Sequence, residues 1–239
     1  MEVIPSIDLK AGRCVRLYQG DFSRETVYSE DPVAVAKDWQ DQGAARLHLV
    51  DLDGAAQGNP ANRTKISQIL RILSIPVQVG GGIRSLGTAA DLIGLGADRV
   101  VIGTAAVEDP DMVEALASRF GSQSLVVAVD ARDGKVSTRG WTENTSVDVL
   151  ELATTMAKLG AVRFLYTDIS RDGTLTQPNY VANAELVEKS GMAVQASGGI
   201  ASLDHIRRLK ETGVEGVIIG SALYTGAVKL GEAIAVGEG

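Results

Sequence analysis

The chain has few of the residues that form disulfides and metal sites. Its 239 residues include one cysteine, Cys14, and two histidines, His48 and His205, which lie far apart. A single cysteine excludes an internal disulfide, and two separated histidines lack the spacing of metal ligands. We therefore expect no metal site.

Long apolar runs and an excess of positive charge are also missing. No apolar run reaches the roughly 18 residues of a membrane span, and the N-terminal sequence MEVIPSIDLK lacks the basic flank and apolar stretch of a signal peptide. The net charge of −7 argues against nucleic acid or an anionic membrane as a partner. We expect a cytoplasmic protein that binds a small molecule.

Aromatic residues are scarce, at 4% of the chain, whereas hydrophobic residues of all kinds make up 45%. This composition suits a core of Val, Ile, Leu and Ala, which buried parallel sheets require. The length is close to the about 250 residues of one eight-fold βα barrel. The expected organisation is one domain, residues 1–239, in a monomer.

Eight short apolar runs rich in β-branched residues alternate with stretches of helical periodicity. The apolar runs are Val3–Ile7, Arg46–Val50, Val77–Val79, Arg99–Ile102, Leu125–Val129, Arg163–Tyr166, Ala193–Ala196 and Gly216–Ile219. The helical stretches are Pro32–Gln42, Asn62–Leu73, Leu86–Leu95, Pro110–Arg119, Val147–Leu159, Val181–Lys189 and Asp204–Thr212. Alternation of this kind predicts an α/β fold with a parallel sheet.

Residues typical of helix boundaries flank several of these stretches. Asp31-Pro32 and Asp109-Pro110 each combine a capping residue with a proline suited to the first helical position. The glycines that follow predicted helices are Gly43, Gly96, Gly160 and Gly213. A glycine there closes a helix in the left-handed conformation.

The second half of the sequence repeats the first at an offset of 117 residues. The segment Val77–Leu86, VQVGGGIRSL, matches Val194–Leu203, VQASGGIASL, and Asp51 matches Asp168. Two half-barrels, about residues 1–122 and 123–239, account for all eight units. Because a closed sheet also leaves no strand edge exposed, the repeat predicts a (β/α)8 TIM barrel built from two repeated half-barrels.

Polar side chains gather where the predicted strands end, which is where such barrels place their active sites. They are Asp8, His48, Asp51, Asp130, Thr167, Asp168 and Asp172. An aspartate after a strand also often caps a helix or forms a local turn. That alternative suits Asp8 and Asp130 less, because glycine-containing loops follow them and the repeat places them on opposite sides. Two such carboxylates suit proton transfer, one as general base and one as general acid.

Each half also carries two glycine-containing turns. They are Gly80-Gly81-Gly82 and Gly103-Thr104 in the first half, and Ser197-Gly198-Gly199 and Gly220-Ser221 in the second. Glycine lets backbone N–H groups approach an oxyanion, and a following helix offers its positive end. Such glycines can instead serve tight turns alone. Two symmetric pairs favour phosphate binding, and they predict a ligand with a phosphate at each end.

Two segments, Leu9–Glu30 and Ala131–Thr145, are much longer than the usual βα connection. They carry Arg16 and Arg139-Gly140-Trp141, and we interpret them as lids, with Trp141 available to cover a planar ring. Arg84 and His48 are further candidates for substrate contact. Arg84 has an alternative interpretation as a solvated side chain, and His48 as a histidine satisfied near the rim.

Five segments resemble one known family along the full chain. They are Pro5–Arg13, Leu47–Gly54, Val79–Arg84, Thr167–Thr174 and Ala196–Ile200. In these segments the chain resembles the phosphoribosylformimino-5-aminoimidazole carboxamide ribotide (ProFAR) isomerases of histidine biosynthesis. The resemblance implies an Amadori rearrangement of an N-linked phosphoribosyl aminoaldose to an aminoketose, catalysed without a cofactor.

The resemblance also implies roles for individual residues. Asp8 matches the family's general base and Asp130 its partner acid, whereas Thr167 and Asp172 match residues at the reacting ribose. Whether Asp130 or Asp172 donates the ring-opening proton stays open. The residues that match the two phosphate sites are Gly82, Gly103, Thr104, Gly199, Gly220 and Ser221.

Three alternatives remain at this stage. A bifunctional variant that also isomerises phosphoribosyl anthranilate in tryptophan biosynthesis resembles Arg139–Trp141, but the following Thr-Glu-Asn-Thr-Ser departs from its glycine-containing segment. The cyclase subunit of imidazole glycerol phosphate synthase shares the repeat and both strand-end aspartates, but differs at Val50–Asp53 and Thr167–Ser170. A non-catalytic phosphosugar sensor would keep the glycine turns without needing Asp8 and Asp130.

Overall fold

The computed structural model describes residues 1–239 and contains a closed barrel of eight parallel strands. Around the barrel the strands are β1 (Glu2–Lys10), β4 (Leu47–Asp51), β5 (Val77–Gly80), β6 (Arg99–Ile102), β7 (Leu125–Arg132), β10 (Arg163–Asp168), β11 (Ala193–Ser197) and β12 (Gly216–Ile219). Pairing of β7 with β10 and of β12 with β1 closes the sheet. These are the eight strands expected from the sequence, so the predicted fold is confirmed.

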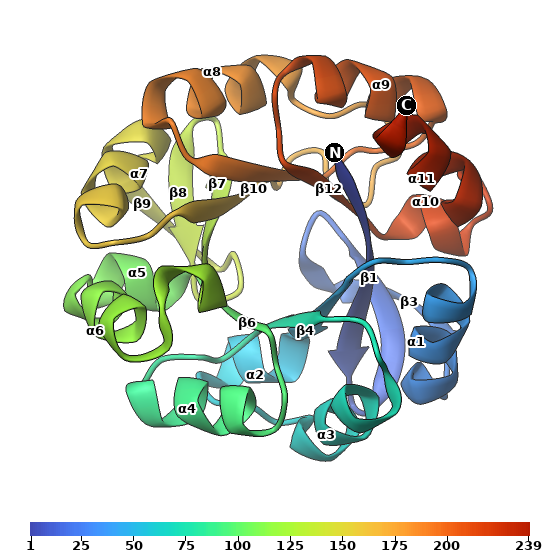
Figure 1. Ribbon diagram of the computed structural model, residues 1–239, viewed down its shortest axis with the longest axis horizontal. Helices are drawn as coiled ribbons and strands as arrows, with labels where there is room; N and C mark the ends of the chain where they lie inside the picture. The colour runs from blue at the N-terminus through green and yellow to red at the C-terminus, as the bar shows by residue number, and fades with distance from the viewer.

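Helices form an outer ring around the strands (Figure 1). The longer helices are α1 (Pro32–Asp41), α3 (Arg63–Ile72), α4 (Leu86–Gly94), α6 (Asp111–Phe120), α7 (Val149–Lys158), α8 (Tyr180–Ser190), α9 (Leu203–Glu211) and α11 (Leu230–Glu238). Shorter ones are α2 (Leu52–Gln57), α5 (Thr104–Glu108), α10 (Ser221–Tyr224) and the 3-10 turn η1 (Ser122–Ser124). No helix combines the length and apolar content needed to cross a bilayer.

The expected helix boundaries are mostly confirmed. Asp31 caps α1 by accepting hydrogen bonds from the backbone N–H groups of Val33 and Ala34. The closing glycines Gly43, Gly96, Gly160 and Gly213 all have positive φ, between 83° and 108°. Asp109 was expected to cap the next helix, which is wrong. It ends α5, and the N-cap of α6 is Pro110, which has no side-chain acceptor.

The two segments interpreted as loops form antiparallel hairpins instead. β1 continues past the barrel and pairs with β2 (Arg13–Tyr18), which pairs with β3 (Asp21–Ser29). β7 likewise pairs with β8 (Lys135–Thr138), which pairs with β9 (Glu143–Asp148). Side chains of β3 and β9 are largely exposed, so no apolar run marks these strands. Both hairpins extend from the C-terminal ends of barrel strands, where the site is expected.

The barrel interior combines an apolar layer with charged groups at its N-terminal end. Five apolar side chains form a buried cluster inside the strands: Ile4, Val101, Val126, Leu165 and Ile218. Arg163 pairs with Glu215, and Arg46, at the equivalent position of the repeat, pairs with Glu2. These ion pairs stabilise the N-terminal end, which leaves the other end of the barrel for function.

Candidate functional site

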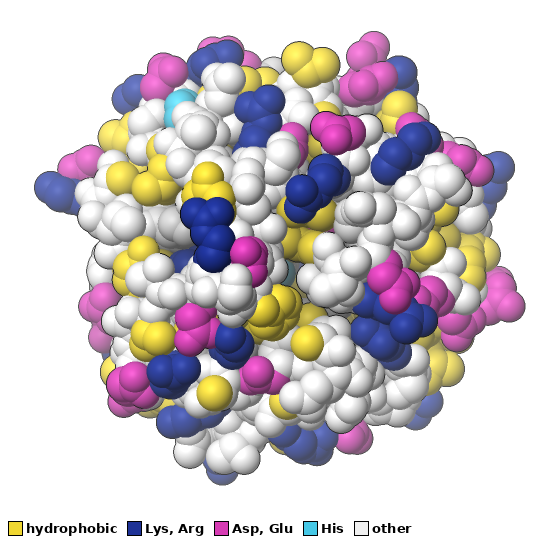
Figure 2. Space-filling model, turned by 180° about the vertical axis from the view of Figure 1, so that it is seen from behind, with side chains coloured by type: hydrophobic (Ala, Val, Ile, Leu, Met, Phe, Trp, Pro, Cys, Tyr) yellow, Lys and Arg dark blue, Asp and Glu magenta, His cyan; other side chains and the backbone are white.

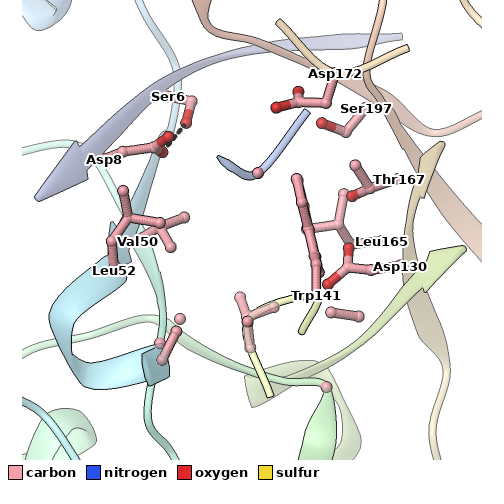
Figure 3. A pocket seen from close by; sticks show the side chains of 18 of the residues that line it. Ser6, Asp8, Val50, Leu52, Asp130, Trp141, Leu165, Thr167, Asp172 and Ser197 are labelled. Atoms are coloured by element: carbon pink, nitrogen blue, oxygen red, sulfur yellow. Dashed lines mark hydrogen bonds between the residues drawn. The ribbon is translucent and has the colours of Figure 1, made fainter. Parts of the chain in front are cut away.

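A pocket opens among the C-terminal ends of the barrel strands. Asp8 and Ser6 of β1 lie on one wall, while Asp130 of β7, Thr167 of β10 and Asp172, in the turn after β10, lie on the other (Figure 3). Most of the residues expected at the site line this pocket. They are Asp8, Arg16, His48, Gly81, Gly82, Arg84, Gly103, Thr104, Asp130, Trp141, Thr167, Asp172 and Ser197.

Five expected residues do not line the pocket. They are Arg139, Gly198, Gly199, Gly220 and Ser221. Arg139 is exposed, and its guanidinium pairs with Glu108 at 2.8 Å and Glu143 at 3.4 Å. Its backbone N–H donates to Thr104, so this residue supports the turn after β6 through its main chain.

Asp8 is a buried carboxylate with one cationic partner. Arg16 of β2 lies 2.8 Å from the Asp8 carboxylate, and the Ser6 hydroxyl donates to Asp8 at 3.3 Å. Burial raises the pKa of Asp8 above its ordinary value, although the Arg16 guanidinium acts in the opposite direction. Asp8 is therefore a desolvated carboxyl whose ionised form is stabilised by a single cation.

Asp172 and Asp130 are also desolvated, but their surroundings differ. Burial raises the pKa of Asp172, and Arg16, 3.6 Å away, opposes the rise. Burial also raises the pKa of Asp130, where only hydrogen bonding by Trp141 and Thr167 opposes it. Asp130 has no salt-bridge partner, so no nearby cation stabilises its ionised form, whereas Arg16 stabilises that of Asp172. Three carboxyls with displaced pKa values around one pocket suit acid–base chemistry.

Two other strand-end aspartates accept hydrogen bonds from the segments that follow their strands. Asp51 is fully buried and accepts hydrogen bonds from the backbone N–H groups of Gly54, Ala61 and Asn62, and from the Asn62 side chain. Its repeat partner Asp168 accepts from Ser170 and Asn179. Asp51 therefore caps a helix and Asp168 forms a local turn, as the alternative interpretation has it, whereas Asp8, Asp130 and Asp172 face the pocket.

Part of the glycine pattern is explained by close packing. Gly81 has φ of +100°, and a Cβ there would lie 2.2 Å from the Asp51 carbonyl oxygen. Gly199 has φ of +80°, and its Cβ would lie 2.3 Å from the Gln177 carbonyl oxygen. Neither position can hold a larger residue without moving the backbone, whether or not a ligand binds.

Gly103 and Gly220 are different, because the fold does not require glycine at either. Both have negative φ and immediately precede the short helices α5 and α10. A Cβ at Gly103 would make only ordinary contact with Ala128, at 3.5 Å. At Gly220 it would meet the Arg16 guanidinium, at 2.3 Å. At Gly103 the bare backbone leaves room for a group that approaches it closely, whereas at Gly220 the Arg16 guanidinium occupies this space.

Trp141 projects into the pocket beside Asp130 and Leu165 (Figure 3). Its ring lies so close to Gly20 of the first hairpin that a Cβ at Gly20 would be 2.1 Å from it. The two hairpins therefore meet over the pocket. Trp141 has φ of +69°, a left-handed conformation that costs a non-glycine residue energy and places the ring here.

His48 lies on β4 and is buried, with one edge at the pocket. Its Nδ1 atom is 2.9 Å from Nε2 of Gln78. Burial, followed by the positive charge of Arg16, lowers the pKa of His48 to about 3. The imidazole is therefore neutral at physiological pH.

Sequence reasoning missed several pocket residues. Ser6 lies two residues before Asp8 on the same strand face, which period-two alternation could have indicated. Gly20 and Phe22 line the pocket because the first hairpin folds over it. Gln78 does not line the pocket, but it contacts His48 from the barrel interior. These three depend on tertiary structure that no local pattern shows.

Positive and negative side chains are mixed on the face that carries the pocket mouth. Figure 2 shows the side of the molecule opposite to Figure 1, with Lys and Arg interspersed among Asp and Glu. Within the pocket the positive side chains are Arg16 and Arg84. Arg84 donates to the Ala55 carbonyl oxygen at 3.1 Å, so Arg16 is the cation nearest to the carboxyls.

Comparison with known proteins gives matches over the whole chain. A family model described as Histidine biosynthesis protein matches residues 2–229. A 1-(5-phosphoribosyl)-5-((5-phosphoribosylamino)methylideneamino)imidazole-4-carboxamide isomerase of Chloroflexus aggregans is 56% identical over 238 residues, covering 100% of this chain and 98% of the relative. Proteins of the same name are 58% identical over 236 residues in Chloroflexus aurantiacus (99% and 98% covered) and 53% identical over 243 residues in Synechocystis (100% and 94% covered).

These matches include every barrel strand and both hairpins that form the pocket. The chain therefore belongs to the histidine biosynthesis protein family and, within it, to the 1-(5-phosphoribosyl)-5-((5-phosphoribosylamino)methylideneamino)imidazole-4-carboxamide isomerases.

Proposed function

We propose that the protein converts ProFAR, an N-linked phosphoribosyl aminoaldose, to its aminoketose by an Amadori rearrangement. The observation that carries this proposal is the set of three desolvated carboxyls around one pocket, Asp8, Asp130 and Asp172. The relatives' names support the substrate, because they describe a molecule with two phosphoribosyl groups.

The chemistry requires an acid and a base in turn. The acid protonates the ribose ring oxygen, and the C1–O bond breaks as the exocyclic nitrogen forms a C=N bond to C1. The base then removes the proton from C2, and the electron pair forms a C1–C2 double bond while the C=N pair returns to the exocyclic nitrogen. Finally, C1 gains a proton while the C2 hydroxyl loses one, which gives the ketone. Groups with a pKa displaced towards neutrality suit both steps.

Asp8 suits the base because Arg16, at 2.8 Å, stabilises its ionised form in a buried site. Asp130 suits the acid because it has no cationic partner and its protonated form is favoured by burial. Asp172 is the weaker candidate acid, since it shares Arg16 with Asp8. Thr167, which pairs in register with Asp130, is available to orient that carboxyl.

The assignment of the acid has a direct test. In a kcat/KM profile, the alkaline limb reports the pKa of the essential acid. We expect residual activity of Asp130→Asn to lose that limb and Asp172→Asn to keep it. The reverse result assigns the acid to Asp172.

Two phosphates would bind at the turns Gly103-Thr104 and Gly220-Ser221. Neither glycine is required by backbone conformation or by packing against main chain, and each precedes a helix. Arg16 lies against Gly220 and would have to move to admit a phosphate there. Its guanidinium charge would remain close enough to pair with the phosphate.

One assay distinguishes the substrate alternatives. The purified protein is incubated without metal or nucleotide with ProFAR, with phosphoribosyl anthranilate, or with the aminoketose plus ammonia. We expect conversion of ProFAR alone. Consumption of phosphoribosyl anthranilate would support a bifunctional enzyme, ammonia-dependent turnover a cyclase, and no turnover a binding protein.

A further inference from the structure

Three polar side chains form a continuous hydrogen-bonded chain through the barrel interior. His48 and Gln78 face each other in register on β4 and β5. Gln78 Nε2 is 2.9 Å from His48 Nδ1 and 2.9 Å from Gln195 Oε1 of β11. Gln195 Nε2 donates back to Gln78 Oε1 at 3.2 Å. Both glutamines are fully buried, so their polar groups have to be satisfied within the protein.

The repeat shows that the histidine is not needed to build the barrel. Gln78 and Gln195 occupy equivalent positions, 117 residues apart. The position equivalent to His48 is Leu165, which belongs to the apolar cluster of the interior. The second half therefore closes the same barrel with a leucine where the first half presents a histidine to the pocket.

The orientation of the two amides is set from the charged end of the barrel. Glu215 is half-buried next to Arg163, and hydrogen bonding by the Gln195 amide is among the causes that lower the pKa of Glu215, against the effect of burial. A carboxylate accepts only, so it directs the Gln195 NH₂ towards itself. The reciprocal pair then fixes the Gln78 amide, whose second N–H points at His48.

This orientation decides where the imidazole carries its proton. Because Gln78 donates to Nδ1, that nitrogen accepts, and in the neutral ring the proton resides on Nε2. Nε2 has no hydrogen-bond partner in the protein and is not among the buried unpartnered atoms, so it is accessible at the pocket edge. Arg16 of β2 is the charged side chain that acts on the ring, and it disfavours the imidazolium.

We propose that Gln78 and Gln195 are positioning residues that hold His48 as a fixed neutral donor, whose Nε2–H binds an acceptor oxygen of the substrate. This inference rests on the proposed isomerase function and adds to it. His48 then keeps its Nε2 proton throughout the reaction and transfers none, and the acid–base steps belong to the aspartates of the pocket.

The tautomer is measurable in the free protein by ¹⁵N NMR of the histidine rings. The chain has only two histidines, so the spectrum of a histidine-labelled sample holds two rings, and His205→Gln assigns them. We expect His48 to show protonated Nε2 and unprotonated Nδ1 at every pH from 5 to 8. Protonated Nδ1, or titration of His48 within this range, would overturn the proposal. Because no substrate is present, this result is independent of whether the isomerase assay succeeds.

Two substitutions of Gln78 separate positioning from packing. Gln78→Glu replaces the donor with a carboxylate that accepts from Nδ1–H, so we expect the proton to move to Nδ1 and the pKa of His48 to rise. Gln78→Met removes the donor and keeps similar volume, so Nε2 should stay protonated. We expect KM to rise about tenfold in Gln78→Glu, the effect of losing one hydrogen bond, and distinctly less in Gln78→Met.

Equal KM values and unchanged His48 titration in the two variants would overturn the proposal. If Gln78→Glu does not fold, Gln195→Met provides a second test, because it releases the Gln78 amide to rotate. We then expect the His48 ring to show a mixture of tautomers, and retention of the wild-type spectrum would remove Gln195 from the proposal.

Discussion

Arg16 is the residue whose replacement should disturb the site most informatively. Its guanidinium lies 2.8 Å from Asp8 and 3.6 Å from Asp172, and all three side chains are largely shielded from water. Replacement by methionine keeps the aliphatic stem but leaves two neighbouring carboxyls without their shared cation. Their pKa values, already raised by burial, should rise further.

The size of the effect follows from the geometry. At an effective dielectric of 20, a charge pair at 2.8 Å attracts by about 6 kcal/mol before the cost of desolvation is subtracted. Removing one partner of a buried pair typically costs about 3–5 kcal/mol. The carboxyls can avoid this cost by binding protons, so the loss depends on pH. Because their folded-state pKa lies above the unfolded value, the folded state binds protons more tightly and loses stability as pH rises.

Urea unfolding of the wild type and of Arg16→Met at pH 5 and pH 8 measures this difference. We expect the loss of unfolding free energy to approach about 3–5 kcal/mol at pH 8 and to be clearly smaller at pH 5. The acidic limb of the kcat/KM profile should also move to higher pH. A loss that is equal at both pH values would refute the inferred coupling between Arg16 and the two carboxyls.

Three further predictions concern the structural and binding residues. Asp51→Ala leaves several buried donors without an acceptor and should lower the free energy of unfolding by about 3 kcal/mol or more, measured by urea unfolding; a change below about 0.5 kcal/mol would contradict this role. Gly81→Ala should destabilise the fold through its contact with Asp51, whereas Gly103→Ala should leave stability unchanged and raise KM. Urea unfolding and steady-state kinetics of both variants test this, and a stable Gly81→Ala together with a destabilised Gly103→Ala would contradict the packing argument. Substrate binding should change the tryptophan fluorescence of the wild type and not that of Trp141→Phe, because the remaining tryptophan, Trp39, is buried in α1. A wild-type fluorescence that does not change when substrate binds would exclude Trp141 from the substrate contact.

The fold was predictable because its information is local and repeated. Each barrel strand is a short apolar run, and the equivalence of Asp51 with Asp168 reveals two halves. The hairpins β2–β3 and β8–β9 were not predictable, because their side chains are partly exposed and their stability comes from pairing with extended barrel strands.

The candidate site was predictable only in part, for a physical reason. Asp8 and Asp51 both follow apolar strand residues, yet one faces the pocket and the other accepts four backbone and side-chain hydrogen bonds. A strand-end aspartate accepts such hydrogen bonds only if the following segment folds back and brings its N–H groups to the carboxylate. The same limit applies to Arg139, which was expected at the substrate and pairs with Glu108 instead. The catalytic and substrate-binding roles themselves stay predictions.

The central claim is that a strand-end carboxylate performs the proton abstraction of the isomerisation. The most direct measurement is the kcat of Asp8→Asn with ProFAR, combined with calorimetric titration of the aminoketose product into the same variant. We predict that kcat falls by at least about 10²-fold while product affinity changes little, because the phosphate-binding turns are intact. A variant with wild-type kcat would contradict the account.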